Sequence, residues 1–393
     1  MAILAPIHLT QFKSYLSMEG DSVFPSGMGG YAVNSLIEAR LRNGLATDVI
    51  TLDPEIRGEM LKFSGPLLRV WVVKKRASGA IRNGFSRERE LMMDALSESQ
   101  PDLVHAHWTY EYGLAAVTQS RYPYIVTVHD HTFRCAQWLG VRYLPLALIS
   151  LYVILRAQHV TAVSSSVGAF VEQFRRRKVP VIPNVLPRIP VKGDGGGVSL
   201  LPQTPRKRTL VSAVNWSSLK NSKRGLAAFQ FARLRLLEHG ISLNYTIIGP
   251  DMNPNGPAAK WAQGHNLADG VLFLGVVPYE DALKIIASAD VLFHPSHEEA
   301  MPGPVCEALA MGVPVVACRE ASGSRWLCGE GRGILCDGYS PEDMAEKIAA
   351  ACIDTKPAGI DGAKVWMNQY ASAERVLGLW SEVYEQAIQV SVL

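Results

Sequence analysis

The stretch that decides the fold is HPSHEEAMPGPVCEALAMGVPVVA, residues 294–317. It starts at the end of an apolar run, DVLFHP (290–295), and crosses a polar loop before it enters a short helix through Pro302-Gly303-Pro304. Proline is tolerated in the first turn of a helix, because the N–H that it lacks would have no intrahelical partner. A second apolar run, VPVVA (313–317), follows the helix. This order of strand, loop, helix and strand predicts one unit of a parallel α/β sheet.

The same alternation continues on both sides of this stretch. In the second half of the chain, further predicted strands are TLVSAV (209–214), LNYTIIG (243–249) and GVLFLG (270–275), and predicted helices are 224–240 and 279–289. In the first half, predicted strands are 46–52, 68–74, 102–107, 124–129, 159–164 and 180–183, and predicted helices are 30–44 and 84–99. Apolar runs without alternation are typical of strands that helices cover on both faces.

The segment between the two halves, RIPVKGDGGGVSLLPQTPRKR (188–208), is rich in Gly, Pro and basic residues, as linkers often are. The sequence therefore predicts the fold class α/β, with two doubly wound, Rossmann-like domains. We expect an N-terminal domain at 1–190, a linker at 191–208 and a C-terminal domain at 209–371. A final helix within 372–393 is expected to pack back on the N-terminal domain. Ligands of open α/β sheets bind outside the carboxyl ends of the strands, so we expect the two domains to face a central cleft.

Composition excludes several classes of protein. The chain has 393 residues and a net charge of +3, which is too small to indicate a nucleic-acid partner. None of its six cysteines forms a C-x-x-C pair, so neither a zinc site nor a secreted disulfide framework is indicated. The start, MAILAPIHLTQFKSYL, lacks the features of a signal peptide, and we expect a cytoplasmic protein.

Contact with the inner face of a membrane is a second expectation, and it has an alternative. The apolar stretch YLPLALISLYVIL (143–155) is too short to span a bilayer, which takes ~20 residues. It is either a buried helix or a helix face that touches a membrane or an apolar acceptor. The basic segments 72–82 and 174–178 are either solvated or meet an anionic lipid surface or a lipid diphosphate.

Two glutamates of the opening stretch are candidate ligands for a sugar or a ribose. Glu299 lies in the loop, and Glu307 lies inside the first turns of the helix. The free amides at this helix start, from Gly303, Val305 and Cys306, together with the helix dipole, predict an anion site. The alternative is that both glutamates only complement the positive end of the helix.

These residues carry a resemblance to a known family. The run from Glu299 to Glu307 fits the E-x7-E pattern and, with its flanks, resembles the retaining glycosyltransferases of family 4, which have the GT-B fold. The resemblance spans most of the chain and includes Gly29-Gly30, PDLVHAH (101–107), Thr127-Val128-His129-Asp130, Val163-Ser164 and Ile182-Pro183-Asn184. The family usually has Gly and then an aromatic residue after the first Glu, where this chain has Ala300 and Met301, and Asn184 is followed by Val185 instead of Gly. Because these changes alter the loop near the sugar, donor identity cannot be carried over.

The resemblance also implies cations for a diphosphate. Family members carry an Arg and a Lys after the first strand of the second domain, and here that segment is AVNWSSLKNSKRGLAAF (213–229). If Lys220 is the family Lys, Asn215 stands in place of the Arg; alternatively, Lys223-Arg224-Gly225 is the match. A lysine acts as a point charge on phosphate, whereas an arginine binds two oxygens. A solvated basic loop is the alternative for all three cations.

Other site residues are predicted at strand ends and turns. The resemblance implies that His129 reaches the transferred sugar, whereas a structural histidine is the alternative. Gly29-Gly30 would let the backbone approach a phosphate or the acceptor, or would form a simple turn. The nucleotide is expected near Gly249 and Val276, with Met301 beside the donor. The resemblance implies no metal and no cofactor other than the nucleotide sugar itself.

The predicted function is retaining transfer of a sugar from a nucleotide diphosphate sugar to a hydroxyl of a sugar or a lipid-linked sugar, in polysaccharide, lipopolysaccharide or glycolipid assembly. Glu299, His129 and Lys223 are the predicted catalytic residues. The alternatives are another GT-B reaction on the same ligand, hydrolysis or epimerisation, and a non-catalytic protein that binds sugar nucleotides. A dehydrogenase is disfavoured, because no G-x-G-x-x-G follows an early strand with an acid about 20 residues on.

Overall fold

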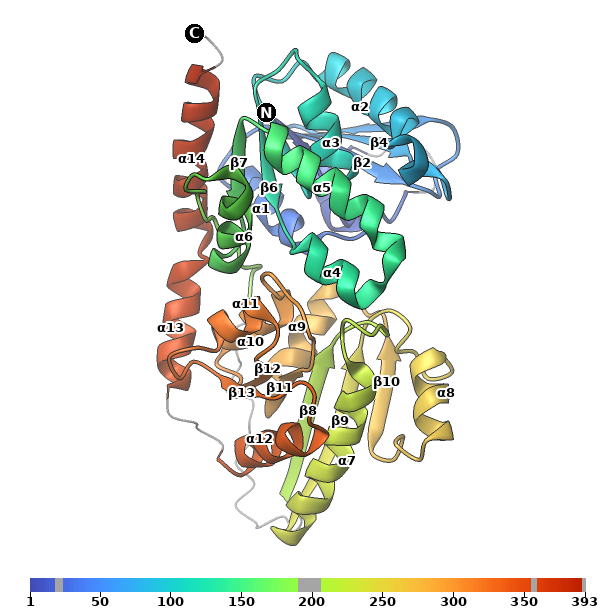
Figure 1. Ribbon diagram of the computed structural model, residues 1–393, viewed down its shortest axis with the longest axis vertical. Helices are drawn as coiled ribbons and strands as arrows, with labels where there is room; N and C mark the ends of the chain where they lie inside the picture. The colour runs from blue at the N-terminus through green and yellow to red at the C-terminus, as the bar shows by residue number, and fades with distance from the viewer. Residues whose placement is uncertain (18–23, 190–205, 355–358, 391–393) are drawn as a thin grey trace. The chain divides into compact units, whose positions relative to one another are not determined.

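The computed structural model describes residues 1–17, 24–189, 206–354 and 359–390 (Figure 1). The chain divides into two compact units, Met1–Val185 with Ala371–Leu393, and Leu186–Tyr370. The linker expected at 191–208 lies outside the described residues, except for 206–208, which belong to a strand. Each unit contains a sheet with helices on both faces, so the prediction of two doubly wound α/β domains is confirmed (Figure 1).

The first unit is built on a seven-stranded sheet in the order β3-β4-β2-β1-β5-β6-β7. Its strands are β1 (Ala2–Leu4), β2 (Thr47–Asp53), β3 (Met60–Ser64), β4 (Leu68–Lys74), β5 (Val104–His107), β6 (Tyr124–Val128) and β7 (His159–Ala162). Its α-helices are α1 (Tyr31–Arg42), α2 (Ser86–Ser99), α3 (Glu111–Thr118), α4 (Thr132–Leu139), α5 (Leu144–Arg156), α6 (Ser165–Arg175) and α14 (Ala373–Val390). Short 3-10 helices are η1 (Leu9–Tyr15), η2 (Ala80–Asn83) and η3 (Val141–Tyr143).

The second unit has a six-stranded, fully parallel sheet in the order β10-β9-β8-β11-β12-β13. Its strands are β8 (Arg206–Ala213), β9 (Ile241–Ile248), β10 (Val271–Gly275), β11 (Val291–His294), β12 (Val315–Cys318) and β13 (Ile334–Cys336). Its helices are α7 (Ser222–Glu238), α8 (Pro257–Gly264), α9 (Tyr279–Ala287), α10 (Gly303–Met311), α11 (Ser322–Leu327), α12 (Pro341–Ile353) and α13 (Ile360–Tyr370).

Three strand assignments in the first unit differ from the structure. The short central strand β1 was not predicted. The segment 180–183 forms only an isolated bridge, between Val181 and Ala162. The strand β3, which was not predicted, pairs antiparallel with β4 at the edge of an otherwise parallel sheet. Because β3 is largely exposed, it lacks the continuous apolar run that marks the buried strands.

The final helix α14 returns to the first unit. Trp380, nearly fully buried, packs with Val376 against Leu36 of α1 and Ile125 of β6 in one core cluster. The second unit has its own core between β8, β9 and α7, with Phe229, Tyr245 and Phe293 among its largest buried side chains.

The apolar stretch expected at 143–155 forms α5. Its interpretation as a buried helix is wrong for one of its two faces, because Leu148 and Leu155 are exposed while Ala147 and Ile154 are buried. In the described part of the chain, we find no helix of the length and hydropathy needed to cross a membrane.

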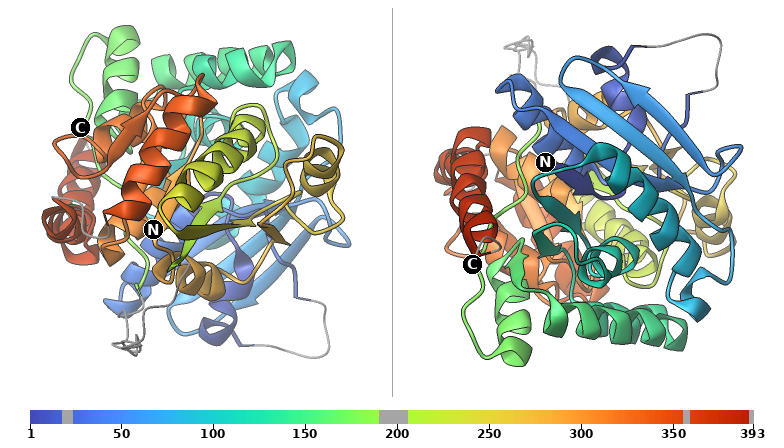
Figure 2. Two further views of the ribbon diagram at one scale, coloured as in Figure 1. Left: turned by 90° about the horizontal axis from the view of Figure 1, so that it is seen from below. Right: turned by 90° about the horizontal axis from the view of Figure 1, so that it is seen from above.

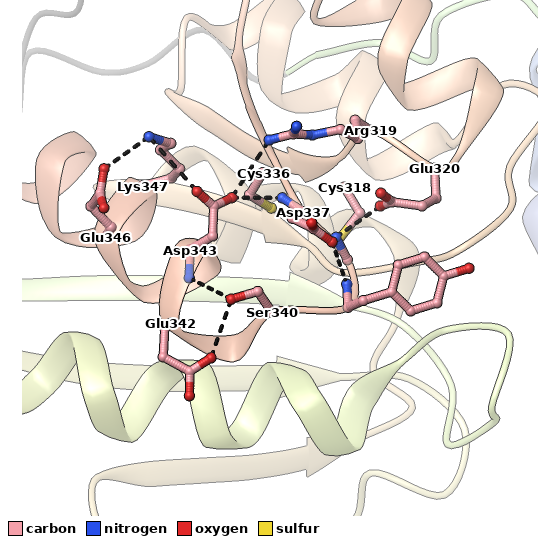
Figure 3. A network of polar contacts seen from close by, with 12 residues as sticks. Cys318, Arg319, Glu320, Cys336, Asp337, Ser340, Glu342, Asp343, Glu346 and Lys347 are labelled. Atoms are coloured by element: carbon pink, nitrogen blue, oxygen red, sulfur yellow. Dashed lines mark hydrogen bonds and ion pairs between the residues drawn. The ribbon is translucent and has the colours of Figure 1, made fainter.

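A polar network fixes the loop between β13 and α12 (Figure 3). The Asp343 carboxylate accepts a hydrogen bond from the Asp337 N–H at 2.7 Å and lies 3.6 Å from the Arg319 guanidinium. The Ser340 hydroxyl caps α12 by accepting from the Asp343 N–H. Glu320 accepts from the Gly338 N–H at 2.8 Å. These bonds hold the loop 337–340 in one conformation, and this loop supports the candidate site.

Candidate functional site

The centre of the candidate site is the Glu299 carboxylate, in the loop between β11 and α10. Its Oε1 atom accepts from the Lys220 Nζ at 2.5 Å and from the His294 Nε2 at 3.0 Å. His294 is the last residue of β11, where a buried strand holds its ring in place. Residues 79 positions apart in the sequence thus meet on one oxygen.

The surroundings keep Glu299 ionised. Burial alone would raise the pKa of this carboxyl, but the charge of Lys220 and the hydrogen bond from His294 outweigh it and leave the pKa well below its usual range. The carboxylate is therefore negative at physiological pH and can only accept hydrogen bonds.

The loop that carries Lys220 is fixed by its neighbours. Asn221, buried and in the left-handed conformation at φ 54°, begins α7 and donates its Nδ2 to the Gly338 carbonyl at 2.8 Å. The Leu219 carbonyl accepts from the His297 N–H at 2.9 Å, which ties this loop to the Glu299 loop. Lys220 is thus placed by bonds on both sides of it.

The other predicted cations lie elsewhere in the same unit. The Lys223 ammonium lies over the rings of Trp216 and Trp261, 5.8 and 5.3 Å from their centroids. The Arg224 guanidinium lies 5.9 Å over the Tyr339 ring. We expected Lys223 among the catalytic residues, but the contact with Glu299 belongs to Lys220.

Asn215, which stands where the family Arg is expected, faces its own loop. Its Oδ1 accepts from the Ser217 hydroxyl at 2.8 Å, and its carbonyl accepts from the Ser222 hydroxyl at 3.2 Å. These two bonds stabilise the turn between β8 and α7.

The N-terminus of α10 offers fewer amides than the sequence predicts. The Cys306 N–H donates to the Pro302 carbonyl at 3.1 Å, and Pro304 has no N–H. Cys306 is therefore already engaged, which leaves the amides of Gly303 and Val305, in the first turn, as the candidate donors to an anion.

Glu307 lies one turn into α10 and is nearly fully buried. Burial raises its pKa to about 7, and the hydrogen bond that its Oε1 accepts from the Tyr279 hydroxyl at 2.6 Å acts in the opposite direction. Glu307 therefore exchanges a proton near neutral pH, unlike Glu299.

The remaining predicted donor-side residues occupy distinct places. Gly249 has φ 131°, and a Cβ there would collide with the Val214 carbonyl, so glycine is required by backbone packing. Val276 is exposed directly after β10, and Met301 is buried in the Glu299 loop. The strands β9 and β8 separate β10 from β11, which places the ends of β10 and β11 roughly 14 Å apart at ~4.8 Å per strand.

The sequence analysis missed residues that hold the Glu299 loop from behind. The Gly323 N–H donates to the Glu299 carbonyl at 2.8 Å, and the Ser322 hydroxyl donates to Glu298 at 2.9 Å. A Cβ on Gly323 would collide with the Ala300 carbonyl. His294 was also missed, although its position at the end of a predicted strand, five residues before Glu299, was a usable signal.

In the first unit, His129 follows β6 and is stacked on Trp108, with ring centroids 4.1 Å apart. Its Nε2 shares a hydrogen bond with the His107 Nδ1 at 2.9 Å. Burial lowers the pKa of His129 to about 3, so the ring is neutral at physiological pH and offers one donor and one acceptor.

The glycine pair also belongs to the first unit. Both glycines have positive φ, 95° for Gly29 and 101° for Gly30, directly before α1. A Cβ on Gly30 would collide with the Pro6 carbonyl, whereas a Cβ on Gly29 would meet open space. Local packing thus requires Gly30 but not Gly29.

The structure brings Lys220, His294 and Glu299 together, and it places Glu307 in the helix that follows. No group of three or more His, Cys, Asp or Glu side chains in the described residues is arranged to hold a metal ion. What the arrangement can do chemically is hold a sugar hydroxyl on a fixed carboxylate and an anion on a lysine and a helix start.

Comparison with known families identifies both halves of the chain. Residues 30–187 match the family described as Glycosyltransferase Family 4, and residues 205–359 match the family described as Glycosyl transferases group 1. A D-inositol 3-phosphate glycosyltransferase of Corynebacterium kroppenstedtii is 33% identical over 127 residues, which are 30% of this chain and 27% of that protein. The match thus spans only about a quarter of that relative's length.

Solved structures share the fold over the full chain. Sucrose-phosphate synthase from Thermosynechococcus elongatus aligns with a TM-score of 0.74 at 16% identity, covering 99% of both chains. Anabaena HepE in complex with UDP and glucose aligns with a TM-score of 0.66 at 14% identity, covering 98% of this chain and 99% of that chain. These likenesses show the fold.

Proposed function

We propose, from the premise that this chain belongs to the group 1, family 4 glycosyltransferases with the GT-B fold, that it transfers a sugar from a nucleotide diphosphate sugar to a hydroxyl acceptor. Transfer proceeds with retention at the anomeric carbon and without a metal ion. The observation that carries the proposal is the contact of Lys220 and His294 with Glu299, which unites the predicted cation loop with the E-x7-E loop.

The departing diphosphate is stabilised by positive groups in this unit. Lys220 supplies a point charge, and the amides of Gly303 and Val305 supply donors at the positive end of α10. Negative charge develops on the leaving phosphate in the transition state. Hydrogen-bond donors that already point at this position before the reaction lower the barrier by roughly 3 kcal/mol each.

Glu299 orients the donor sugar. A carboxylate that is ionised and fixed by two donors accepts hydrogen bonds from sugar hydroxyls. Lys220 beside it balances the negative charge of Glu299 near the diphosphate. The diphosphate oxygen takes the acceptor proton in this scheme, because it gains negative charge and becomes more basic as its bond to the sugar breaks.

Other predicted residues take roles around this centre. Glu307, one turn into α10, accepts from the ribose hydroxyls, and the backbone near Val276 reads the base. The spacing of roughly 14 Å between the ends of β10 and β11 suits an extended nucleotide sugar that lies across four strand ends. His129 is a neutral group for a hydroxyl of the transferred sugar.

The acceptor is a sugar or a lipid-linked sugar, in the assembly of a polysaccharide, lipopolysaccharide or glycolipid. The names of similar proteins point to different molecules, D-inositol 3-phosphate in one and sucrose phosphate in another. The acceptor of this chain is therefore proposed only as a class.

A ligand screen followed by a matched pair of variants tests the proposal. Thermal unfolding is recorded with uridine, guanosine and adenosine diphosphate sugars, uridine first because Anabaena HepE holds UDP. A ligand at about 100 times its Kd stabilises the native state by about 2.7 kcal/mol. No shift with any of the three nucleotides would contradict the proposal.

The variants Lys220→Met and Lys223→Met then separate the two candidate lysines. Lys220→Met is expected to lower turnover by about 10²–10³-fold, as expected when a preorganised donor is lost. Lys223→Met, which removes a cation from two tryptophan rings, is expected to change turnover by only a few-fold. Release of free sugar without acceptor, at the full rate, would indicate a hydrolase instead.

A further inference from the structure

One face of α5 is an exposed apolar stripe. Its members recur every three or four residues and therefore lie on one side of the helix. They are Leu144, Leu148, Tyr152 and Leu155, and Val141 of the preceding 3-10 helix η3 extends the stripe. The opposite face, with Ala147, Val153 and Ile154, is packed into the first unit, so α5 is a stable part of the fold whose outer face has no cover in the described residues (Figure 1 and Figure 2).

The stripe is unusual for a surface in contact only with water. Leu148 is 57% exposed and Val141 85% exposed, and no acidic or basic residue interrupts the run from Leu144 to Leu155. Single exposed leucines are common on soluble proteins, but contiguous apolar patches mark a surface that binds another molecule or a membrane.

The charged residues near the stripe indicate the kind of partner that it binds. Residues 131–171 contain no aspartate or glutamate, but they contain Arg134, Arg142 and Arg156. The run Arg175-Arg176-Arg177-Lys178 follows at the end of α6. The only acidic residue in 131–178 is Glu172, which pairs with Lys178 at 3.3 Å.

The structure brings the second basic group to the end of the stripe. The Arg175 guanidinium donates to the carbonyls of Ile154 and Ala157 at 2.5 Å, and Arg177 donates to the Gln158 carbonyl at 2.5 Å. These residues therefore cap the C-terminus of α5 and keep their positive charge beside Arg156. The Lys178 side chain is exposed at the same end.

We propose that the outer face of α5, with the basic residues at its C-terminal end, docks the protein on the surface of an anionic lipid bilayer. The helix lies parallel to the membrane, with its leucines among the acyl chains and its cations at the headgroups. At 13 residues, α5 is too short to cross the bilayer, which agrees with a position on its surface.

A second copy of the chain fits this surface less well. The α5 face of a second copy offers no negative charge to Arg156 and Lys178, because residues 131–171 contain no aspartate or glutamate. Anionic lipid offers both an apolar layer and negative charge. The inference stands on α5 and α6 alone and is independent of the proposed catalytic residues.

Vesicle co-sedimentation of the full chain tests the inference. The protein is expected to bind vesicles of phosphatidylcholine with about a third phosphatidylglycerol and to bind pure phosphatidylcholine at least tenfold more weakly, with a loss of binding at high salt. The double variant Leu144→Asp/Leu148→Asp is expected to lose binding at least tenfold, because two charges would enter the acyl region.

The chain offers a matched control on α7. Leu234 is 63% exposed and lies in the other unit, so Leu234→Asp makes the same change at an equally exposed leucine and should leave binding unchanged. A charge variant, Arg156→Gln/Lys178→Gln, keeps the apolar stripe and should weaken binding about fivefold for each charge removed. Circular dichroism checks that each variant is folded.

Three results would overturn the inference. They are equal binding to neutral and anionic vesicles, full binding by the α5 double variant, and a wild-type dimer that this variant converts to a monomer in light scattering. Thermal shifts with donor sugars are recorded on the same variants. A variant that loses vesicles but keeps the donor response separates the membrane surface from the catalytic proposal.

Discussion

The two glutamates of the E-x7-E run differ in the charge that their surroundings allow. Glu299 shares Lys220 and His294 and stays ionised, whereas Glu307 has only a tyrosine hydroxyl and a buried position. Burial raises the pKa of Glu307 to about 7 and therefore favours its neutral form below that pH. One carboxyl is a permanent acceptor, and the other titrates in the physiological range.

The raised pKa of Glu307 predicts a pH dependence of stability. Between the ordinary glutamate pKa, near 4.5, and about 7, the folded state keeps a proton that the unfolded state releases, so stability falls as pH rises through this window. The shift corresponds to about 3 kcal/mol for this group. In Glu307→Gln this contribution is absent, so the free energy of unfolding should change less with pH than in the wild type. Chemical denaturation of both proteins at about pH 5 and about pH 8 measures the difference.

Tyr279→Phe is the control for this prediction. It removes the hydrogen bond that lowers the pKa of Glu307, so the decline of stability should extend to higher pH and be larger in total than in the wild type. Equal pH slopes for the wild type and Glu307→Gln would contradict a raised pKa at this position.

At the residue scale, the run 294–317 and its family resemblance predicted the glutamate pair, whereas the choice among Lys220, Lys223 and Arg224 was left open. Lys220 lies in the turn before α7 and Lys223 in the first turn of that helix, and the left-handed conformation of Asn221 and its bond to Gly338 fix the chain between them. Gly338 is 117 positions away in the sequence, so no local pattern could show this support.

At the element scale, the longer buried strands were predicted, whereas the three-residue strands β1 and β13 and the edge strand β3 were not. The strands β11 and β12 are continuous apolar runs, and the predicted boundaries are close to the observed ones. The exposed strand β3 carries no such run, and the segment 180–183 is apolar but forms only one bridge. Hydrophobic patterns report burial, and burial alone does not distinguish a strand from an extended segment.

The two glycines before α1 predict unequal effects of the same substitution. Gly30→Ala forces a Cβ into the Pro6 carbonyl and should reduce the free energy of unfolding by roughly 3 kcal/mol or more. Gly29→Ala has open space around it and only the cost of a positive φ, roughly 1–2 kcal/mol. Urea denaturation of both variants measures the difference; equal losses would mean that the Pro6 contact is not as tight as described.

If the backbone at Gly29 contacts a ligand and Gly30 is needed only for folding, turnover should distinguish the two glycines. Gly29→Ala should lower turnover at a temperature where the variant is fully folded. An unchanged rate in folded Gly29→Ala would remove this glycine from the proposed phosphate or acceptor contacts.

At the scale of the whole molecule, the family prediction is confirmed, and the fold is shared with enzymes at only 11–16% identity. The alternation of strands and helices is sufficient to predict two doubly wound units. The sequence also predicts that the chain leaves the second domain after residue 371, and in the structure the first unit takes up the chain again at Ala371.

Because α14 belongs to the first unit, a substitution in this helix should destabilise the first unit and leave the second unit unchanged. Trp380→Ala removes a ring that lies 4.3 Å from His105 and 5.4 Å from Tyr384, centroid to centroid, and should destabilise the first unit by about 3–5 kcal/mol. Calorimetry should show one unfolding transition moving to lower temperature.

Trp366→Ala on α13 is the matched control, because this ring packs on Arg332 and Tyr370 of the second unit. It should move the other transition. If both variants moved the same transition, the assignment of α14 to the first unit would be wrong in solution.

The discontinuity of the first unit has a consequence for synthesis. A ribosome that has translated the chain through Tyr370 has produced every residue of the second unit, while the first still lacks α14. Domains commonly fold as they emerge, the N-terminal one first. In this protein the second unit can therefore reach its native state first. Until α14 has been synthesised, Leu36 and Ile125 of the first unit lack Trp380, which covers them.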